Sequence, residues 1–224
     1  KYWKILSFED LAEELYANLS ASYVQDKSLK VETQEAALQF YAELQPGVEE
    51  YGTYRLLLYS GLIQLIIHSS VNDYEQLLGV CDDLLDKFSQ KPYTAGVPIQ
   101  IFNYQQLICF IQLGDYPRGQ QAAPRALQFI ERGSYNWFKY NELLLQLSFH
   151  TDNFQGGCEV LETVFNEKAF DNLPAANKEI WYINLAFAVF LQREGKISLP
   201  PDDSVFNHFR LGKFLNTIPI FSKD

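Results

Sequence analysis

The stretch GDYPRGQQAAPRAL, Gly114–Leu127, places a polar turn directly before an aromatic residue and a run of small and apolar residues. After Tyr116, small residues follow at offsets of three, seven and ten positions, as Gly119, Ala123 and Ala126. This spacing brings side chains to one face of an α-helix. The stretch therefore predicts a tight turn followed by a helix that buries one narrow face.

The same pattern occurs twice more along the chain. Asn72-Asp73-Tyr74 and Asp152-Asn153-Phe154 are each followed by apolar or small residues at the same offsets, and the three aromatic residues are 42 and 38 positions apart. An apolar segment with helical character precedes each turn, at Tyr51–His68, Val97–Leu113 and Tyr135–Phe149. Each unit thus predicts a helix, a turn and a second helix, and residues 51–166 are expected to hold three such repeats.

The second repeat resembles the tetratricopeptide repeat (TPR), whose second half reads Gly-Asp-Tyr-x-x-Ala-x-x-x-Phe-x-x-Ala. Residues 114–116 and Ala126 match that pattern, whereas Ala123 stands where the family has a large aromatic. Leu77 and Gly157 replace the first small alanine in the other two repeats, and all three exceed the family length of about 34 residues. The resemblance implies an all-α fold, an α-solenoid of stacked antiparallel helix pairs that forms a right-handed superhelix.

Residues 1–50 are expected to form an N-terminal helical pair. Ser7 is positioned to cap a helix over Phe8–Tyr23, which carries apolar residues at every fourth position. A second helix is expected over Val31–Leu44 and should stop at Pro46-Gly47, because proline and glycine disfavour helix interiors.

Residues 167–224 are expected to form a C-terminal helical pair. Pro174 suits the first turn of a helix that extends to Arg193, and Gly195 suits the position just after its end. A last helix, capped by Asp202 or Asp203, is expected to reach about Asn216. Since no closing polar helix follows, the array is expected to continue in further sequence; the end of the chain is also similar to bacterial helical-repeat proteins.

Pro124 lies inside the second helix of the second repeat. An interior proline costs about 3 kcal/mol, so this helix is expected either to begin late, near Ala122, or to kink. Pro117 instead suits its first turn.

The charge of the chain disfavours polyanionic partners. Its formal net charge is −10, which opposes binding to nucleic-acid phosphates and to anionic membrane surfaces. The longest apolar stretches, Leu56–Ile67 and Trp181–Leu191, fall well short of the roughly 20 residues that a membrane span requires. We therefore expect no nucleic-acid partner and no membrane insertion.

The cysteines predict the compartment. Cys81, Cys109 and Cys158 are far apart, lie in apolar helical stretches and form no C-x-x-C motif. They are expected to be small core residues in a reducing, cytoplasmic environment. The first residue is Lys1 rather than methionine, so the sequence leaves open whether a signal peptide has been removed.

No sequence motif for catalysis, metal binding or a cofactor is recognised. Phosphate loops, nucleophile elbows and the H-E-x-x-H motif do not occur. His68 and His150 fall at what look like equivalent helix ends, where the helix dipole favours them. The carboxylate clusters Glu9-Asp10-Glu13-Glu14 and Asp82-Asp83-Asp86 can be read as cation or acid–base sites, but helical spacing supplies no third ligand and solvated faces are favoured. We expect no enzyme activity, no metal and no cofactor.

The TPR resemblance implies a partner-binding concave face lined by the first helix of each pair. Carried onto this sequence, the lining positions are Tyr59, Tyr104, Lys139, Glu142 and Gln146. Most aromatic residues are expected in the core, and some tyrosines in the groove. The expected function is a scaffold that binds a protein or peptide segment. The alternatives are a regulatory or sensor segment of a larger enzyme or transcription factor, and an enzyme in its own right. The oligomeric state stays open.

Overall fold

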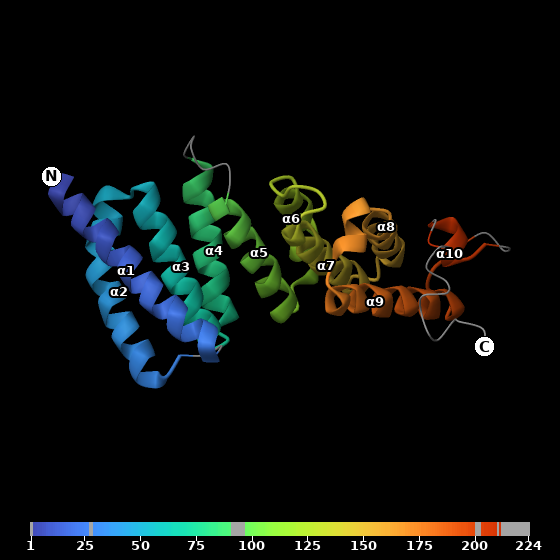
Figure 1. Cartoon of the computed structure of the whole chain (residues 1–224), viewed down its shortest axis with the longest axis horizontal. Coiled ribbons are helices and arrows are strands. Elements are labelled where there is room, and N and C mark those ends of the chain that lie inside the picture. The colour runs from blue at the N-terminus through green and yellow to red at the C-terminus, as the bar shows by residue number, and fades with distance from the viewer. Residues whose placement is uncertain (1, 27–28, 91–96, 200–202, 210, 212–224) are drawn as a thin grey trace. The chain divides into compact units, whose positions relative to one another are not determined.

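The computed structural model describes residues 2–26, 29–90, 97–199, 203–209 and 211 (Figure 1). Within these ranges all regular structure is helical and no strand occurs, which confirms the all-α class. The α-helices are α1 (Tyr2–Asp26), α2 (Val31–Tyr51), α3 (Tyr54–Ser70), α4 (Tyr74–Ser89), α5 (Val97–Gln112), α6 (Tyr116–Leu127), α7 (Tyr135–His150), α8 (Phe154–Phe165), α9 (Ala175–Arg193) and α10 (Val205–His208), and a 3₁₀ turn spans Lys168–Asn172.

The chain divides into two compact units, Lys1–Gly114 and Asp115–Asp224, here called the first and second unit. In the first unit α3 packs against α1, α2 and α4, and α5 packs against α4. In the second unit α7 packs against α6 and α8, α8 packs against α9, and α9 packs against α10. The two helices of the second expected repeat, α5 and α6, belong to different units, and the division into residues 1–50, 51–166 and 167–224 stays a prediction.

The three expected turns share one backbone conformation. Asn72, Gly114 and Asp152 have φ angles of 56°, 72° and 56°, in the left-handed region that Gly, Asn and Asp tolerate best. The residue that follows is the N-cap of the next helix in each case. The side chains of Asp73 and Asn153 accept a hydrogen bond from the amide N–H three residues further along. The sequence pattern therefore located all three helix starts correctly.

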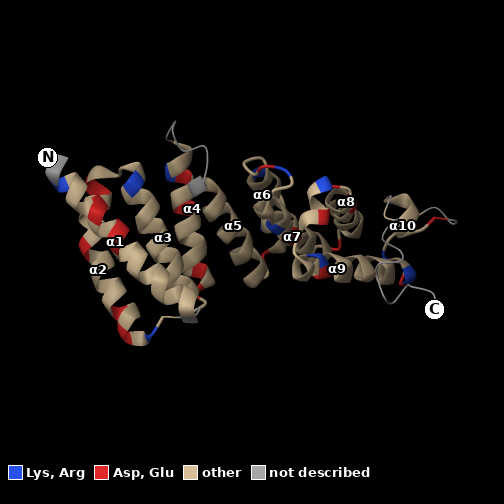
Figure 2. Ribbon diagram, in the orientation of Figure 1, with Lys and Arg blue, Asp and Glu red and all other residues tan. Residues whose placement is uncertain are grey.

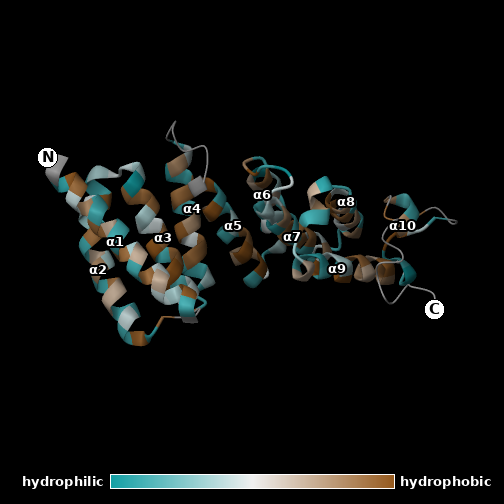
Figure 3. Ribbon diagram, in the orientation of Figure 1, coloured by the Kyte–Doolittle hydropathy of each residue, from teal (hydrophilic) through white to brown (hydrophobic). Residues whose placement is uncertain are grey.

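The helices that follow these turns bury the expected faces. Their residues at offsets of three, seven and ten from the aromatic are all buried: Leu77, Cys81 and Leu84 in α4, Gly119, Ala123 and Ala126 in α6, and Gly157, Leu161 and Val164 in α8. Leu127, the last residue of α6, is half-buried and packs against this core. Figure 3 shows the alternation of apolar and polar residues along these helices.

The N-terminal helix begins earlier than expected. α1 starts at Tyr2, so Ser7 lies inside the helix and is not its N-cap. Its hydroxyl donates to the carbonyl of Lys4, 2.8 Å away, which is how serine is accommodated in a helix interior. The third helix differs in the other direction, since Thr53 caps α3 and Tyr51 belongs to α2.

The second helix does not stop at Pro46-Gly47 as expected. α2 continues to Tyr51 and ends at Gly52, whose φ of 49° is left-handed. Gly47 is buried, and a Cβ there would come within 2.6 Å of the Phe8 ring on α1. Close packing of α1 on α2 at this glycine favours the helical backbone that proline and glycine alone oppose.

Pro124 also lies within a continuous helix. α6 begins at Tyr116 with Pro117 in its first turn, so a late start near Ala122 is wrong. The ring of Pro124 is on the exposed side of α6, whereas Ala123 is buried.

The C-terminal expectations are partly confirmed. α9 runs from Ala175 to Arg193 with Pro174 at its N-cap position. Gly195, with φ of 70°, donates to the carbonyl of Gln192, and Lys196 donates to Leu191, which closes the helix in a Schellman motif.

The cap of the last helix differs from the expected one. Ser204, not Asp202 or Asp203, caps α10, and its hydroxyl accepts the N–H of Asn207 at 3.2 Å. α10 ends at His208, Phe209 is its C-cap and Leu211 is not helical, so this helix is shorter than expected; the other residues up to Asn216 lie outside the described residues.

Candidate functional site

A row of polar contacts joins α1 to α3 in the first unit. We call it the α1–α3 seam; its members are Glu9, Asp10 and Glu13 on α1 and Thr53, Arg55 and Tyr59 at the start of α3. The Thr53 hydroxyl donates to Glu9 Oε1 at 2.6 Å, and the Tyr59 hydroxyl donates to Glu13 Oε1 at 3.0 Å. Residues four positions apart share a helix face, so both helices present their polar side chains along one line.

Arg55 contacts all three carboxylates of this seam. Its guanidinium lies 3.2 Å from Asp10 Oδ1 and 3.6 Å from Glu9 Oε2, and it also contacts Glu13. The hydrogen bond from Arg55 is the main reason that the pKa of Glu13 falls below its ordinary value, and the bond from Tyr59 adds to it. The carboxylates that the sequence suggested as a solvated face or an acid–base pair therefore fasten α1 to α3.

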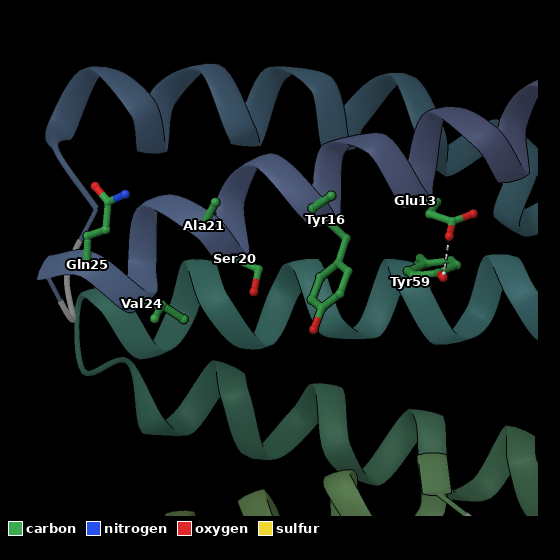
Figure 4. Close-up of a pocket in the computed structure, with 8 residues that line it drawn as sticks. Glu13, Tyr16, Ser20, Ala21, Val24, Gln25 and Tyr59 are labelled. Atoms are coloured by element: carbon green, nitrogen blue, oxygen red, sulfur yellow. Dashed lines mark hydrogen bonds between the residues drawn. The ribbon is translucent and has the colours of Figure 1, made fainter.

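An open groove of about 590 Å³ lies beside the seam (Figure 4). Its lining combines two aromatic rings, small side chains, a hydroxyl and an amide: Glu13, Tyr16, Ala17, Ser20, Ala21, Val24, Gln25 and Tyr59. The rings of Tyr16 and Tyr59 lie 5.6 Å apart in a tilted arrangement. Burial, and then the bond to Glu13, raises the pKa of Tyr59 above its ordinary value, so the phenol stays a neutral donor. Such a surface offers both apolar contact and hydrogen bonds.

The structure places the other expected groove residues in separate settings. Tyr104 is half-buried on α5 in the first unit. Lys139, Glu142 and Gln146 follow one stripe of α7 in the second unit, and Lys139 Nζ lies 3.0 Å from Glu142 Oε2. The side chains of this pair are only 27% and 19% exposed, so the two charges satisfy each other at a half-buried surface.

Sequence reasoning selected Tyr59 but not the residues that contact it or its partner Glu13. Arg55, Thr53 and Tyr16 were not selected, because each is unremarkable within its own helix. One signal was present: Arg55 is the only Lys or Arg between Lys30 and Lys87. A single cation in a long acidic stretch indicates a structural partner for carboxylates elsewhere.

The second carboxylate cluster is engaged by neighbouring side chains. Asp82 accepts from the Gln106 amide at 2.6 Å, Asp83 pairs with Lys87 at 2.7 Å, and Asp86 accepts from the Gln90 amide at 2.8 Å. In the ranges that the structure describes, no group of three or more His, Cys, Asp or Glu side chains could hold a metal ion. Of these three contacts, that of Asp82 joins α4 to α5, and the other two lie along α4 and its C-cap.

The histidines at the helix ends are not equivalent. When the turn after α3 is aligned with the turn after α7, 80 residues later, the residue equivalent to His68 is Ser148 and not His150. His68 Nδ1 lies 4.0 Å from Asp73 Oδ2, and burial lowers the pKa of His68. His150 instead stacks on Tyr116 with the ring centroids 4.3 Å apart. The two histidines therefore lie in the last turns of α3 and α7, as expected, but at different positions within those turns.

The cysteines are core residues, as expected. Cys81, Cys109 and Cys158 are buried and free, and burial raises the pKa of Cys109 to about 11 and of Cys158 to about 12.

No helix in the described part of the chain is both long enough and apolar enough to cross a membrane. No known protein family, curated protein or solved structure matches this chain.

Proposed function

We propose that this chain is a TPR-like helical-repeat scaffold that binds a protein or peptide segment and has no catalytic activity of its own. The repeated turn supports the repeat assignment, because each of three helices follows a residue in the left-handed conformation, and two of them have a side-chain hydrogen bond at the N-cap. In α-solenoids of this kind the first helices of successive pairs line an extended surface that receives partners.

The observation that carries the proposal is the groove between α1 and α3. These helices are alternate in the chain order α1–α2–α3, and they pack directly against each other. Tyr59, a position expected to line the binding face, does line this groove. Tyrosine rings with polar tips, together with the Gln25 amide, suit an extended peptide whose side chains pack while its backbone forms hydrogen bonds.

Blocking the groove tests the proposal. Ala21 is exposed and lines the groove, so Ala21→Trp should fill it without disturbing the core. Asn18, exposed on the same helix but outside the lining, gives the matched control Asn18→Trp. Ten-residue peptides selected from a random phage-displayed library should bind Ala21→Trp at least about tenfold more weakly than the parent, as expected for loss of a central contact. Equal binding to the parent and Ala21→Trp would remove the groove from the proposal.

A second arm separates peptide from nucleic-acid partners. The parent is titrated with the selected peptides, with duplex DNA and with single-stranded RNA at two salt concentrations. Nucleic-acid affinity falls steeply with salt in proportion to the phosphates contacted, and a chain of net charge −10 should show little of it. Tight, salt-dependent DNA or RNA binding without any peptide binding would refute a peptide scaffold.

A further inference from the structure

The first unit contains a second hollow that shares no residue with the α1–α3 groove. It has a volume of about 500 Å³ and lies over α3 between residues of α2 and α4. We call it the α2–α4 pocket; it is lined by Tyr41, Gln45, Val48, Glu49, Gly52, Leu57, Ser60, Gln64, Asp83, Leu84 and Lys87. Its volume is within the range of about 300–1,000 Å³ that small ligands and peptide side chains occupy.

The inner part of the pocket combines apolar and hydroxyl groups. Leu57, Leu84 and Ser60 are all buried. The Tyr41 hydroxyl lies 3.2 Å from Ser60 Oγ, so the two oxygens form a paired donor and acceptor at the inner end. Burial is the main reason that the pKa of Tyr41 lies above its ordinary value, so its phenol stays neutral. The inner part of the pocket therefore offers an occupant aliphatic carbon atoms with neutral polar atoms beside them.

The rim of the pocket is acidic. Glu49 on α2 and Asp83 and Lys87 on α4 are exposed there. Lys87 Nζ already pairs with Asp83 Oδ2 at 2.7 Å, so the rim carries one more carboxylate than it has ammonium groups. α2 as a whole contains five glutamates and no Lys or Arg.

The surrounding unit has the same sign of charge. The first unit contains 15 acidic and 7 basic residues, whereas the second contains 13 and 11, so most of the net charge belongs to the first. Acidic residues recur along α1, α2 and α4 in Figure 2. A field of this sign attracts cationic segments and raises their association rate.

We propose that the α2–α4 pocket binds an arginine- or lysine-bearing peptide segment. The inference rests on the proposed scaffold function and names the chemistry of the partner. The methylene stem of the basic side chain packs on Leu57 and Leu84, and its head group binds Glu49 and competes with Lys87 for Asp83. The pocket is larger than one side chain, so it accommodates adjacent residues whose backbone the Gln45 and Gln64 amides can reach.

Because Lys87 competes for Asp83, the inference predicts the direction in which a Lys87 substitution changes the affinity for basic peptides. A second peptide selection uses Ala21→Trp, in which the α1–α3 groove is filled, so that its peptides bind elsewhere. Each peptide is synthesised with its Arg or Lys, and again with citrulline or glutamine in its place, and binding is followed by fluorescence anisotropy. Lys87→Gln frees the Asp83 carboxylate, so it should tighten the basic peptides by about two- to fivefold. Glu49→Gln should weaken them by about three- to fivefold, and raising the salt concentration should weaken them further.

A matched control separates local contact from overall charge. Glu43 is exposed on the same helix as Glu49 but does not line the pocket, so Glu43→Gln should leave the affinity almost unchanged. If citrulline peptides bind as well as basic ones, or if Lys87→Gln weakens binding, the basic-segment inference is wrong while the scaffold proposal stands. If the selection on Ala21→Trp yields no binding peptide, the basic-segment inference is wrong; if the selection on the parent yields none either, both proposals are wrong.

Discussion

The hairpins α3–α4 and α7–α8 have the same frame 80 residues apart. The first helices end at Ser70 and His150, and the second helices begin at Tyr74 and Phe154. The left-handed residues between them, Asn72 and Asp152, have the same φ of 56°. Both turns also share the backbone hydrogen bond from the N-cap residue to the carbonyl five positions earlier. The turn thus determines where each helix ends and begins.

The hairpins differ in which helix supplies the small residue at their contact. In the first, Gly61 on α3 admits the side chains of Leu84 and Phe102, and a Cβ there would lie 2.6 Å from Phe102 Cζ. The corresponding residue of α7 is Asn141. In the second hairpin, Gly157 on α8 admits Phe149 of α7 instead, and a Cβ would lie 2.7 Å from Phe149 Cδ1. Gly157 in turn aligns with Leu77 of α4, so the two glycines lie at different contacts, and the repeats that align at the turn diverge within the helices.

The largest expected effect extends the comparison to α6. Ala126 aligns with Leu84 and Val164 and is 1% exposed. Ala126→Glu places a carboxylate in that buried position and should lower the free energy of unfolding by at least about 3 kcal/mol. The exposed neighbour provides the control Arg125→Glu, which should have little effect. Urea denaturation followed by circular dichroism measures both, and equal stability of parent and Ala126→Glu would mean that the repeat register is wrong in α6.

Gly61 and Gly157 should each be intolerant of a larger side chain, because a Cβ at either position would overlap a neighbouring ring. Gly61→Val and Gly157→Val overpack the helix contact and should each cost about 2–3 kcal/mol of unfolding free energy. Gly79 is the contrast, because it is exposed within α4 and a Cβ added there would have no other atom within 4 Å. Gly79→Ala should stabilise the protein by about 0.5–1 kcal/mol through helix propensity. Chemical denaturation measures all three variants, and a destabilised Gly79→Ala alongside a tolerated Gly61→Val would reverse the expected order.

A smaller effect is expected at the two turns, and it should be similar in both because the hydrogen bond that Asn72 Oδ1 accepts from the Tyr74 hydroxyl is exposed. Asn72→Ala and Asp152→Ala force a residue with a Cβ and no local hydrogen-bonding group into the left-handed region, which should cost about 1 kcal/mol each. Asn72→Gly and Asp152→Gly should cost less than the alanine substitutions, because glycine itself, as Gly114, occupies this position in the turn before α6. Thermal melts of the four variants check this, and clearly unequal alanine costs would show that the turns are not equivalent.

The smallest expected effect concerns the α1–α3 seam of the first unit. The pKa of Glu13 is depressed in the folded state, so its bond to Arg55 contributes stability above the ordinary glutamate pKa and loses it as the pH falls through the depressed value. Arg55→Gln should therefore be less stable than the parent at neutral pH and approach it in acid, as urea denaturation at a series of pH values would measure. Arg125→Gln, outside the seam, should show no trend of this kind; a pH-independent difference for Arg55→Gln would contradict the role of Glu13.

The sequence predicted the turns well because their signals are local. A left-handed residue, a capping side chain and a helical stripe all lie within a dozen positions, and Gly195 closes α9 by the same local logic. The errors arose where a distant residue intervened. Phe8 on α1 packs at Gly47 and favours continuation of α2 through Pro46, a contact that no local pattern reveals. Tyr59 was selected through the TPR resemblance, but its hydrogen bond to Glu13 could not be predicted, because the two residues are 46 positions apart in the sequence.

The buried thiols make opening of the fold measurable by chemical labelling. Only the thiolate reacts with reagents such as iodoacetamide, and burial disfavours that form at all three cysteines while also excluding the reagent. Modification must therefore wait for a local or global opening fluctuation, and its rate reports the free energy of that opening. Cys81 and Cys109 report on the first unit and Cys158 on the second. Mass spectrometry of labelled peptides would therefore measure the labelling rate of each unit separately, in a protein without any substitution.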